Sequence, residues 1–234
     1  MKISEVIQRV QSLYSRGVQS DDSRLTSRHI YNKLITTRAK LLVQRANKKQ
    51  RISQWNYQTL PCVALEKVPV HDCPCLPPIG CDIYRTKYPL PKPLTSLNTT
   101  LIQSVLSLDG SLSFDEILMH NVKNKKGSKY TKYKPDYFIK NEYLYLILVR
   151  GIDLITITAL FQDPVEAYQY PSYCEEDCED CQDCESPLDK EFPIDSELVD
   201  TLISLAVQEL IIMFSQAKED TLNNSRDANV DIQE

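Results

Sequence analysis

Eight cysteines are the residues of this chain whose type and spacing could support chemistry. They fall into two groups of four, the first being Cys62, Cys73, Cys75 and Cys81 and the second Cys174, Cys178, Cys181 and Cys184. Four thiolates can hold a zinc ion tetrahedrally, and such a site is structural because no coordination position stays open for a substrate. The ligands could come from either group alone or from both groups together.

The second group lies in a strongly acidic segment, YCEEDCEDCQDC, at residues 173–184. Its C-x₂-C-x₂-C spacing matches part of an iron–sulfur run, but the rest of that motif is missing. Neighbouring carboxylates also oppose the thiolate form that a metal requires. The alternative interpretation is therefore a solvated acidic loop, and a structural zinc is the one cofactor that we leave open.

The state of these thiols depends on the compartment. No segment approaches the roughly 20 uncharged apolar residues of a membrane-spanning helix. Glu5 lies within the first turns of the N-terminal segment, unlike the apolar core of a signal peptide. We therefore expect neither export nor a membrane anchor, and in a reducing cytoplasm the cysteines should be thiols or metal ligands rather than a disulfide framework.

Signatures of catalysis are missing from the sequence. The histidines, His29, His71 and His120, belong to no HExxH or similar arrangement. With five glycines in the chain, there is no GxGxxG or GxxxxGK loop to cradle a phosphate. The carboxylates of the acidic segment form a run of like charges, which is a poor setting for one general acid. We expect no enzymatic activity.

Charge is distributed very unevenly along the chain. Between Arg24 and Arg51 there are nine Lys or Arg and no acid, whereas from Cys174 onward eighteen acids face three Lys or Arg. Opposite poles of this kind suit head-to-tail or ring association, in which the basic end of one subunit meets the acidic end of the next. The alternative is two solvated faces that never meet.

A second basic segment, KNKKGSKYTKYK, interleaves lysines with tyrosines. Its candidate contact residues are Lys125, Lys126, Lys129 and Lys132. Lysines can meet phosphates and tyrosines can stack on bases, so the segment could contact DNA. Two alternatives, an exposed loop whose tyrosines pack locally and a loop that contacts an acidic neighbouring subunit, together outweigh sequence-specific recognition of DNA.

Periodicity in the sequence predicts an α+β protein. Apolar residues at helical spacing predict an N-terminal helical hairpin, and a C-terminal helix that is apolar over much of its surface. Aromatic and β-branched runs at 137–139, 143–149 and 152–161 predict a central antiparallel β-meander of three strands. Prolines between Gln54 and Pro93 predict a loop-rich arm rather than a long helix.

These patterns divide the chain into six segments. They are N-terminal helices at 1–52, a proline- and cysteine-rich arm at 53–98, a β-rich core at 99–168, an acidic cysteine loop at 169–192, the C-terminal helix at 193–218 and a tail at 219–234.

The order of these features resembles a family of structural proteins of crAss-like and related gut bacteriophages. The segments SDDSRLTSRHIYNKL and YFIKNEYLY are the most specific, supported by QWNYQTLPCVALEKVP and FPIDSELVDTLISLAVQEL. The resemblance runs from about Met1 to Phe214 and does not extend beyond Lys218.

This resemblance implies a structural virion protein, made in the host cytoplasm, that forms a head-to-tail connector ring of twelve copies in the phage neck. Such a ring docks on the portal and on other neck or tail proteins, helps to retain packaged double-stranded DNA and forms part of its ejection channel. The family offers no catalytic residues to carry over. The alternative is a cytoplasmic zinc-binding module that contacts nucleic acid through its basic segments.

The basic helix supplies the candidate contacts to a neighbouring subunit or portal, namely Arg38, Lys40 and Arg45. Reversing their charge should weaken oligomerisation or portal docking while leaving the monomer folded.

Overall fold

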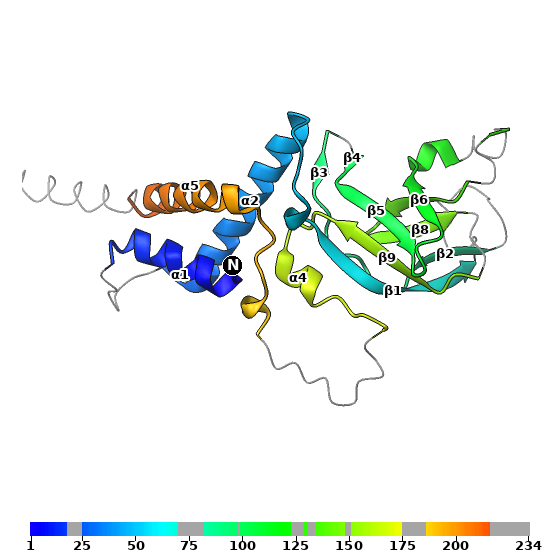
Figure 1. The fold of residues 1–234 in the computed structure, drawn as a ribbon, viewed down its shortest axis with the longest axis horizontal. Helices are drawn as coiled ribbons and strands as arrows, with labels where there is room; N and C mark the ends of the chain where they lie inside the picture. The colour runs from blue at the N-terminus through cyan, green and yellow to red at the C-terminus, as the bar shows by residue number, and fades with distance from the viewer. Residues whose placement is uncertain are drawn as a thin grey trace, which may run out of the picture.

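Helices and strands of the protein segregate into two packed units (Figure 1). The structure, a computed structural model, describes residues 1–17, 25–69, 82–97, 99–122, 129–130, 134–147, 151–174 and 186–215. Three long helices form one end of the elongated molecule, and a β-barrel forms the other end. The expected α+β class is confirmed, although the sheet differs from the one expected.

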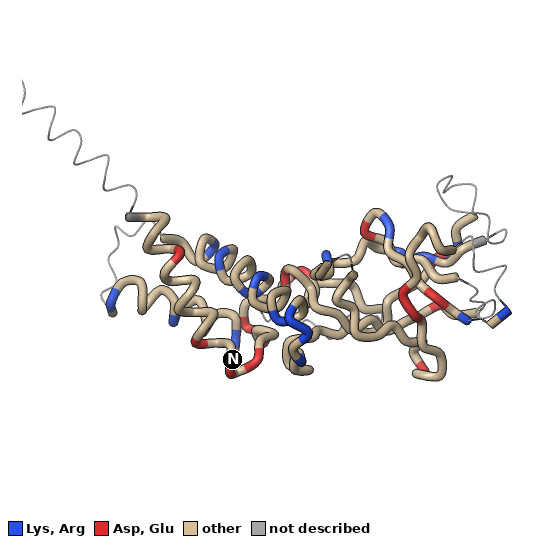
Figure 2. Tube along the Cα trace, turned by 90° about the horizontal axis from the view of Figure 1, so that it is seen from above, with Lys and Arg blue, Asp and Glu red and all other residues tan. Residues whose placement is uncertain are grey.

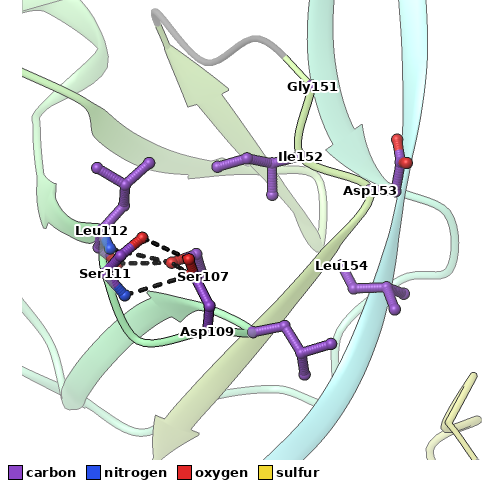
Figure 3. Close-up of a pocket in the computed structure, with 9 residues that line it drawn as sticks. Ser107, Asp109, Ser111, Leu112, Gly151, Ile152, Asp153 and Leu154 are labelled. Atoms are coloured by element: carbon purple, nitrogen blue, oxygen red, sulfur yellow. Dashed lines mark hydrogen bonds between the residues drawn. The ribbon is translucent and has the colours of Figure 1, made fainter.

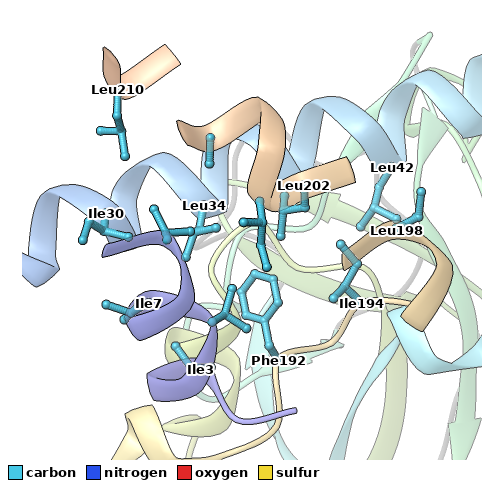
Figure 4. Close-up of a cluster of buried hydrophobic side chains, with 14 of the residues drawn as sticks. Ile3, Ile7, Ile30, Leu34, Leu42, Phe192, Ile194, Leu198, Leu202 and Leu210 are labelled. Carbon is cyan, nitrogen blue, oxygen red and sulfur yellow. The ribbon is translucent and has the colours of Figure 1, made fainter. Parts of the chain in front are cut away.

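The helical unit brings together both ends of the chain. Helix α1 (Ile3–Tyr14) and helix α2 (Ser27–Asn47) pack with helix α5 (Ser196–Ser215). Helix α1 buries Ile3, Val6, Ile7 and Val10, the i, i+3, i+4, i+7 pattern of one helical face. Figure 4 shows Ile3 and Ile7 of this face converging with side chains of α2 and α5. The N-terminal hairpin is therefore completed by the C-terminal helix, which shares its core.

Seven strands close into a barrel in the order β1-β2-β8-β7-β6-β5-β9. Their bounds are β1 Gln58–Pro69, β2 Asp82–Thr86, β5 Ile102–Ser107, β6 Ser113–Glu116, β7 Asp136–Lys140, β8 Tyr143–Ile147 and β9 Leu154–Ala159. Neighbours are antiparallel except β6 and β7, which run parallel. Strand β9 buries Ile155, Ile157 and Ala159 alternately, as a strand with one face in the core should. Apolar side chains fill the interior of the barrel.

The expected three-strand meander is only partly correct. Strands β7 and β8 form the expected hairpin, with Tyr137 opposite Leu146 and positive φ at Asn141 and Glu142 in the turn. Strand β9, however, pairs with β1 and β5 instead of β8. Barrel closure decides this pairing, because each strand needs a hydrogen-bonded neighbour on both edges.

The expected proline-rich arm is also wrong in part, because its two flanks are barrel strands β1 and β2. Strand β1 accommodates Pro61 at a register shift between Leu60 and Val63, where Cys62 has φ +50°. A bulge is the usual place for proline in a strand, since its missing N–H interrupts the ladder there. The intervening residues 70–81 lie outside the described part of the chain.

Short elements complete the fold. They are the 3₁₀ helices η1 (Gln54–Asn56), η3 (Met119–Asn121) and η4 (Pro187–Asp189), helix α4 (Pro164–Tyr168), and the paired strands β3 (Thr95–Ser96) and β4 (Thr99–Thr100). Among the described residues, no helix has the length and apolar character needed to cross a membrane.

Candidate functional site

One cysteine from each sequence group takes part in a disulfide bond. Cys62 and Cys174 are joined with their Cα atoms 5.6 Å apart, although 112 positions separate them in the sequence. This corrects the expectation of thiols or metal ligands for these two residues, because a disulfide sulfur supplies no thiolate. The other six candidates, Cys73, Cys75, Cys81, Cys178, Cys181 and Cys184, lie outside the described residues.

Aromatic contacts surround this disulfide. The ring of Tyr173 stacks on that of Tyr88 with centroids 6.2 Å apart, and Lys87 Nζ lies 4.7 Å from the Tyr173 ring centroid. The hydroxyl of Tyr170 donates to the carbonyl of Tyr88 across 3.2 Å. Together with the disulfide, these contacts fix the start of the acidic segment to the barrel wall. Within the described ranges, no group of three or more His, Cys, Asp or Glu could hold a metal ion.

Arg38 is buried where the helical unit meets the barrel. Its side chain has no solvent exposure, and its three nitrogens donate to three backbone carbonyls. Nε lies 2.8 Å from Pro193 O, Nη1 lies 2.8 Å from Phe161 O, and Nη2 lies 3.1 Å from Asn56 O. Burial lowers the pKa of the guanidinium to about 10. The expected role of Arg38 as a surface contact is therefore wrong, because this residue holds the two units together.

A second polar contact extends this joint. The hydroxyl of Tyr31 on α2 donates to Asp163 Oδ1 across 2.6 Å. Asp163 is the N-cap of α4, and the same oxygen accepts from the backbone N–H of Val165 across 2.9 Å. Burial, followed by the hydrogen bond to Asp163, raises the pKa of Tyr31. Helix α2 is thus attached to the barrel through side chains seven positions apart.

The other two candidate contacts of α2 are accessible. Lys40 is exposed, and its Nζ lies 3.2 Å from Glu209 Oε1 of α5. Lys33 pairs with the same carboxylate. Both lysines lower the pKa of Glu209, and the hydrogen bond from Lys33 has the larger effect. Arg45 is half-buried in the last turn of α2. Figure 2 shows Lys and Arg recurring along the middle of the molecule, where α2 runs.

Of the lysine-rich segment, the structure describes Lys129, Tyr130 and Lys134, while Lys125, Lys126 and Lys132 lie outside the described ranges. Tyr130 is 89% exposed, the largest exposure among the large hydrophobic side chains of the described residues. Lys129 Nζ lies 5.9 Å from the centroid of that ring. The pair forms an exposed aromatic and basic knob on the barrel.

The joint between the two units also carries a groove that sequence reasoning missed. The volume of this joint groove is about 430 Å³, and its aromatic lining residues are Trp55, Tyr57, Tyr168 and Phe192. Trp55 is 75% exposed although it is the single tryptophan of the chain. The signal available in the sequence was the single tryptophan itself, because tryptophan is a residue type that is enriched at protein contact surfaces.

A second cavity lies at the barrel end remote from the helices, between the β5–β6 turn and the start of β9. It measures about 320 Å³ (Figure 3). The carboxylate of Asp109 accepts from Ser107 Oγ and from the hydroxyl and N–H of Ser111, and these bonds lower its pKa to about 2. An ionised carboxylate satisfied by its own turn organises that turn and is a poor proton acceptor.

A family model described as phage tail ring protein 2 matches residues 5–231 of the chain. The chain belongs to this family. The resemblance to a ring protein of crAss-like phages is therefore confirmed over nearly the whole sequence. No curated protein matches the sequence. Membership makes the chain a structural component of a phage tail, and a ring component assembles with other proteins of that tail.

For a structural tail ring protein, the candidate functional site is a set of contact surfaces. The candidate contact surfaces among the described residues are the basic surface of α2, the aromatic joint groove and the knob at Lys129 and Tyr130. Arg38 and the disulfide cross-link the chain segments that carry these surfaces.

Proposed function

We propose that this tail ring protein forms the head-to-tail connector ring of its phage, with twelve copies between the portal and the tail. The ring helps to retain packaged DNA and forms part of its ejection channel. Assembly takes place in the host cytoplasm, and the mature ring is part of the virion. The observation that carries the proposal is the match to a tail ring family over residues 5–231.

The charge distribution supports such a position. Helix α2 carries cations along its length and no acid, and Lys48 and Lys49 continue the basic surface beyond its end. A lumen that passes duplex DNA needs contacts with phosphates that are independent of base sequence, and exposed lysines supply them. The same surface could dock on an acidic rim of a portal ring.

The division of the chain into a helical unit and a barrel also supports the connector proposal. A ring subunit must transmit load between axial neighbours without opening, and the buried donors of Arg38 join helices to barrel in this chain. The packed interior of the barrel implies that DNA would pass through the centre of the ring rather than through a subunit.

Electron microscopy of the chain co-assembled with its portal tests the proposal. We expect rings of twelve copies seated on one end of the portal, and native mass spectrometry should give the mass of twelve chains. Rings of another copy number would contradict the stoichiometry, and rings that ignore the portal would contradict the connector position.

The alternative function, a zinc-binding module that contacts nucleic acid, is less well supported than the connector ring, because Cys62 and Cys174 are bonded to each other. A structural zinc held by the six remaining cysteines stays a prediction. Native mass spectrometry of the intact chain, with and without a chelator, would show the metal as a discrete mass difference.

A further inference from the structure

The joint groove has the chemistry of a receptor for an aromatic side chain. Trp55 and Tyr168 are exposed lining residues of this groove, and Phe192 is a buried one. Large aromatic residues bury much area at low cost in conformational entropy, which is why they dominate the centres of protein interfaces. A groove with these walls fits a flat aromatic side chain of a partner.

The charged side chains that line the joint groove are acidic. They are Glu191 and Asp195, and the lining includes no Lys or Arg. The hydroxyl of Tyr168 donates to the carbonyl of Glu191 across 2.9 Å, so one wall is fixed to the acidic rim. The groove therefore favours a partner that brings a positive charge beside its aromatic ring.

This chain carries such a group on a different surface. Tyr130 projects from the connection between η3 and β7, with Lys129 beside it and further lysines on either side in the sequence. Its 89% exposure shows that it does not occupy the joint groove of its own subunit. The groove lies where the helices meet the barrel, so knob and groove are two separate patches of one subunit.

A contact between two different patches is heterologous, and heterologous contacts are the ones that close into rings. We infer that the joint groove of each subunit receives Tyr130 and Lys129 of the next subunit, so that knob and groove form the repeating contact of the ring. This inference rests on the proposed ring and specifies its interface. The tyrosine ring packs against Trp55 and Tyr168, and Lys129 faces Glu191 and Asp195.

The single tryptophan gives this contact an internal reporter. Trp55 is exposed in the free subunit, and the docked tyrosine would remove it from water. We expect the fluorescence emission of Trp55 to move to shorter wavelength as rings form. Tyr130→Ala should remove that shift and weaken assembly at least about tenfold, the usual order for loss of a central aromatic contact.

A charge exchange tests which charged residues meet across the contact. Glu191→Lys and Lys129→Glu should each weaken assembly, and the double variant should recover most of the loss because the pair is restored in reverse. Leu97→Asn is the matched control, because Leu97 is also a surface side chain at 79% exposure but lies between β3 and β4 and belongs to neither patch. This control should assemble normally.

The outcomes distinguish a failure of the proposed interface from a failure of the proposed ring. Rings that form without a shift in Trp55 emission, or that tolerate Tyr130→Ala, would overturn the interface while leaving the connector proposal intact. A failure to form rings, alone or on the portal, would contradict the connector proposal. In that case a synthetic peptide of residues 123–134 still decides the groove: it should shift the emission of Trp55, and its Tyr130→Ala version should not. Absence of any shift with the wild-type peptide would overturn the inference.

Discussion

Arg38 Nη1 lies 2.8 Å from the carbonyl oxygen of Phe161, a residue 123 positions away in the sequence. Phe161 follows β9, so this hydrogen bond ties the middle of α2 to the end of a barrel strand. Two more carbonyls, those of Pro193 and Asn56, accept from the same guanidinium. One side chain thus satisfies three buried acceptors from three segments, and its removal would leave all three without that donor.

We therefore predict that Arg38→Met lowers the free energy of unfolding by about 3 kcal/mol or more. The free energy of unfolding of Arg38→Lys should lie between those of the wild type and Arg38→Met, because an ammonium cannot reproduce the planar fork of donors. Lys40→Met is the control, because Lys40 is exposed and its loss should cost less than about 1 kcal/mol. Urea denaturation followed by circular dichroism measures all three. Equal stability of the Arg38→Met and Lys40→Met variants would disprove the role of Arg38.

Removal of the disulfide should also destabilise the chain. Cys62→Ser, Cys174→Ser and the double variant should each lose about 2–4 kcal/mol, because each removes the same cross-link and restores entropy to the unfolded chain. Since Cys174 is exposed, a mild reductant should lower the melting temperature of the wild type far more than that of the double variant. Alkylation under non-reducing conditions is the direct check, and modification of all eight cysteines would rule out the bond.

The Tyr31–Asp163 contact should respond to alkaline pH. The pKa of Tyr31 is raised in the folded chain above its ordinary value of 10.0, so its contribution is fully present below pH 10. That contribution is lost as the pH rises toward the folded-state pKa, because the unfolded chain releases its phenol proton first. Tyr31→Phe should cost about 1 kcal/mol at pH 7.

The difference between wild type and Tyr31→Phe should shrink above pH 10, and denaturant titrations at pH 7, 9, 10 and 11 measure it. Comparison with this one variant cancels the contributions of the other buried tyrosines. A difference that stays constant across this range would mean that the Tyr31 phenol has an ordinary pKa.

A charge reversal confined to exposed residues tests the basic surface of α2. Lys40→Glu, Lys48→Glu and Lys49→Glu together should weaken ring formation or portal docking at least about tenfold while leaving the fold intact, since each of these side chains is exposed. Analytical ultracentrifugation and circular dichroism separate the two effects.

The corresponding Lys→Gln triple variant should show a smaller loss, because it removes attraction without adding repulsion. Normal rings of the Glu variant that also seat on the portal in electron microscopy would show that this face meets neither a neighbour nor the portal. Arg38 is excluded from the set, because reversing a buried charge would unfold the joint.

Local pattern was sufficient to predict α1, much of α2, α5 and the β7–β8 hairpin. Burial at i, i+3, i+4 and i+7 in α1, and the alternation of β9, arise from the geometry of each element alone. The pairing of β9 with β1 and β5 could not be read in this way, because a barrel closes through hydrogen bonds between strands far apart in the sequence.

The sequence by itself determined the family, the uneven charge and the positions of most helices and strands, because these depend on residue type and short-range spacing. Only the tertiary structure decided that Arg38 is a buried joint rather than a surface contact, that Cys62 bonds Cys174, and that Trp55 borders an aromatic groove. Each of these facts depends on segments between roughly a hundred and a hundred and fifty positions apart meeting in space. Such meetings are set by the packing of the whole chain, which no local pattern encodes.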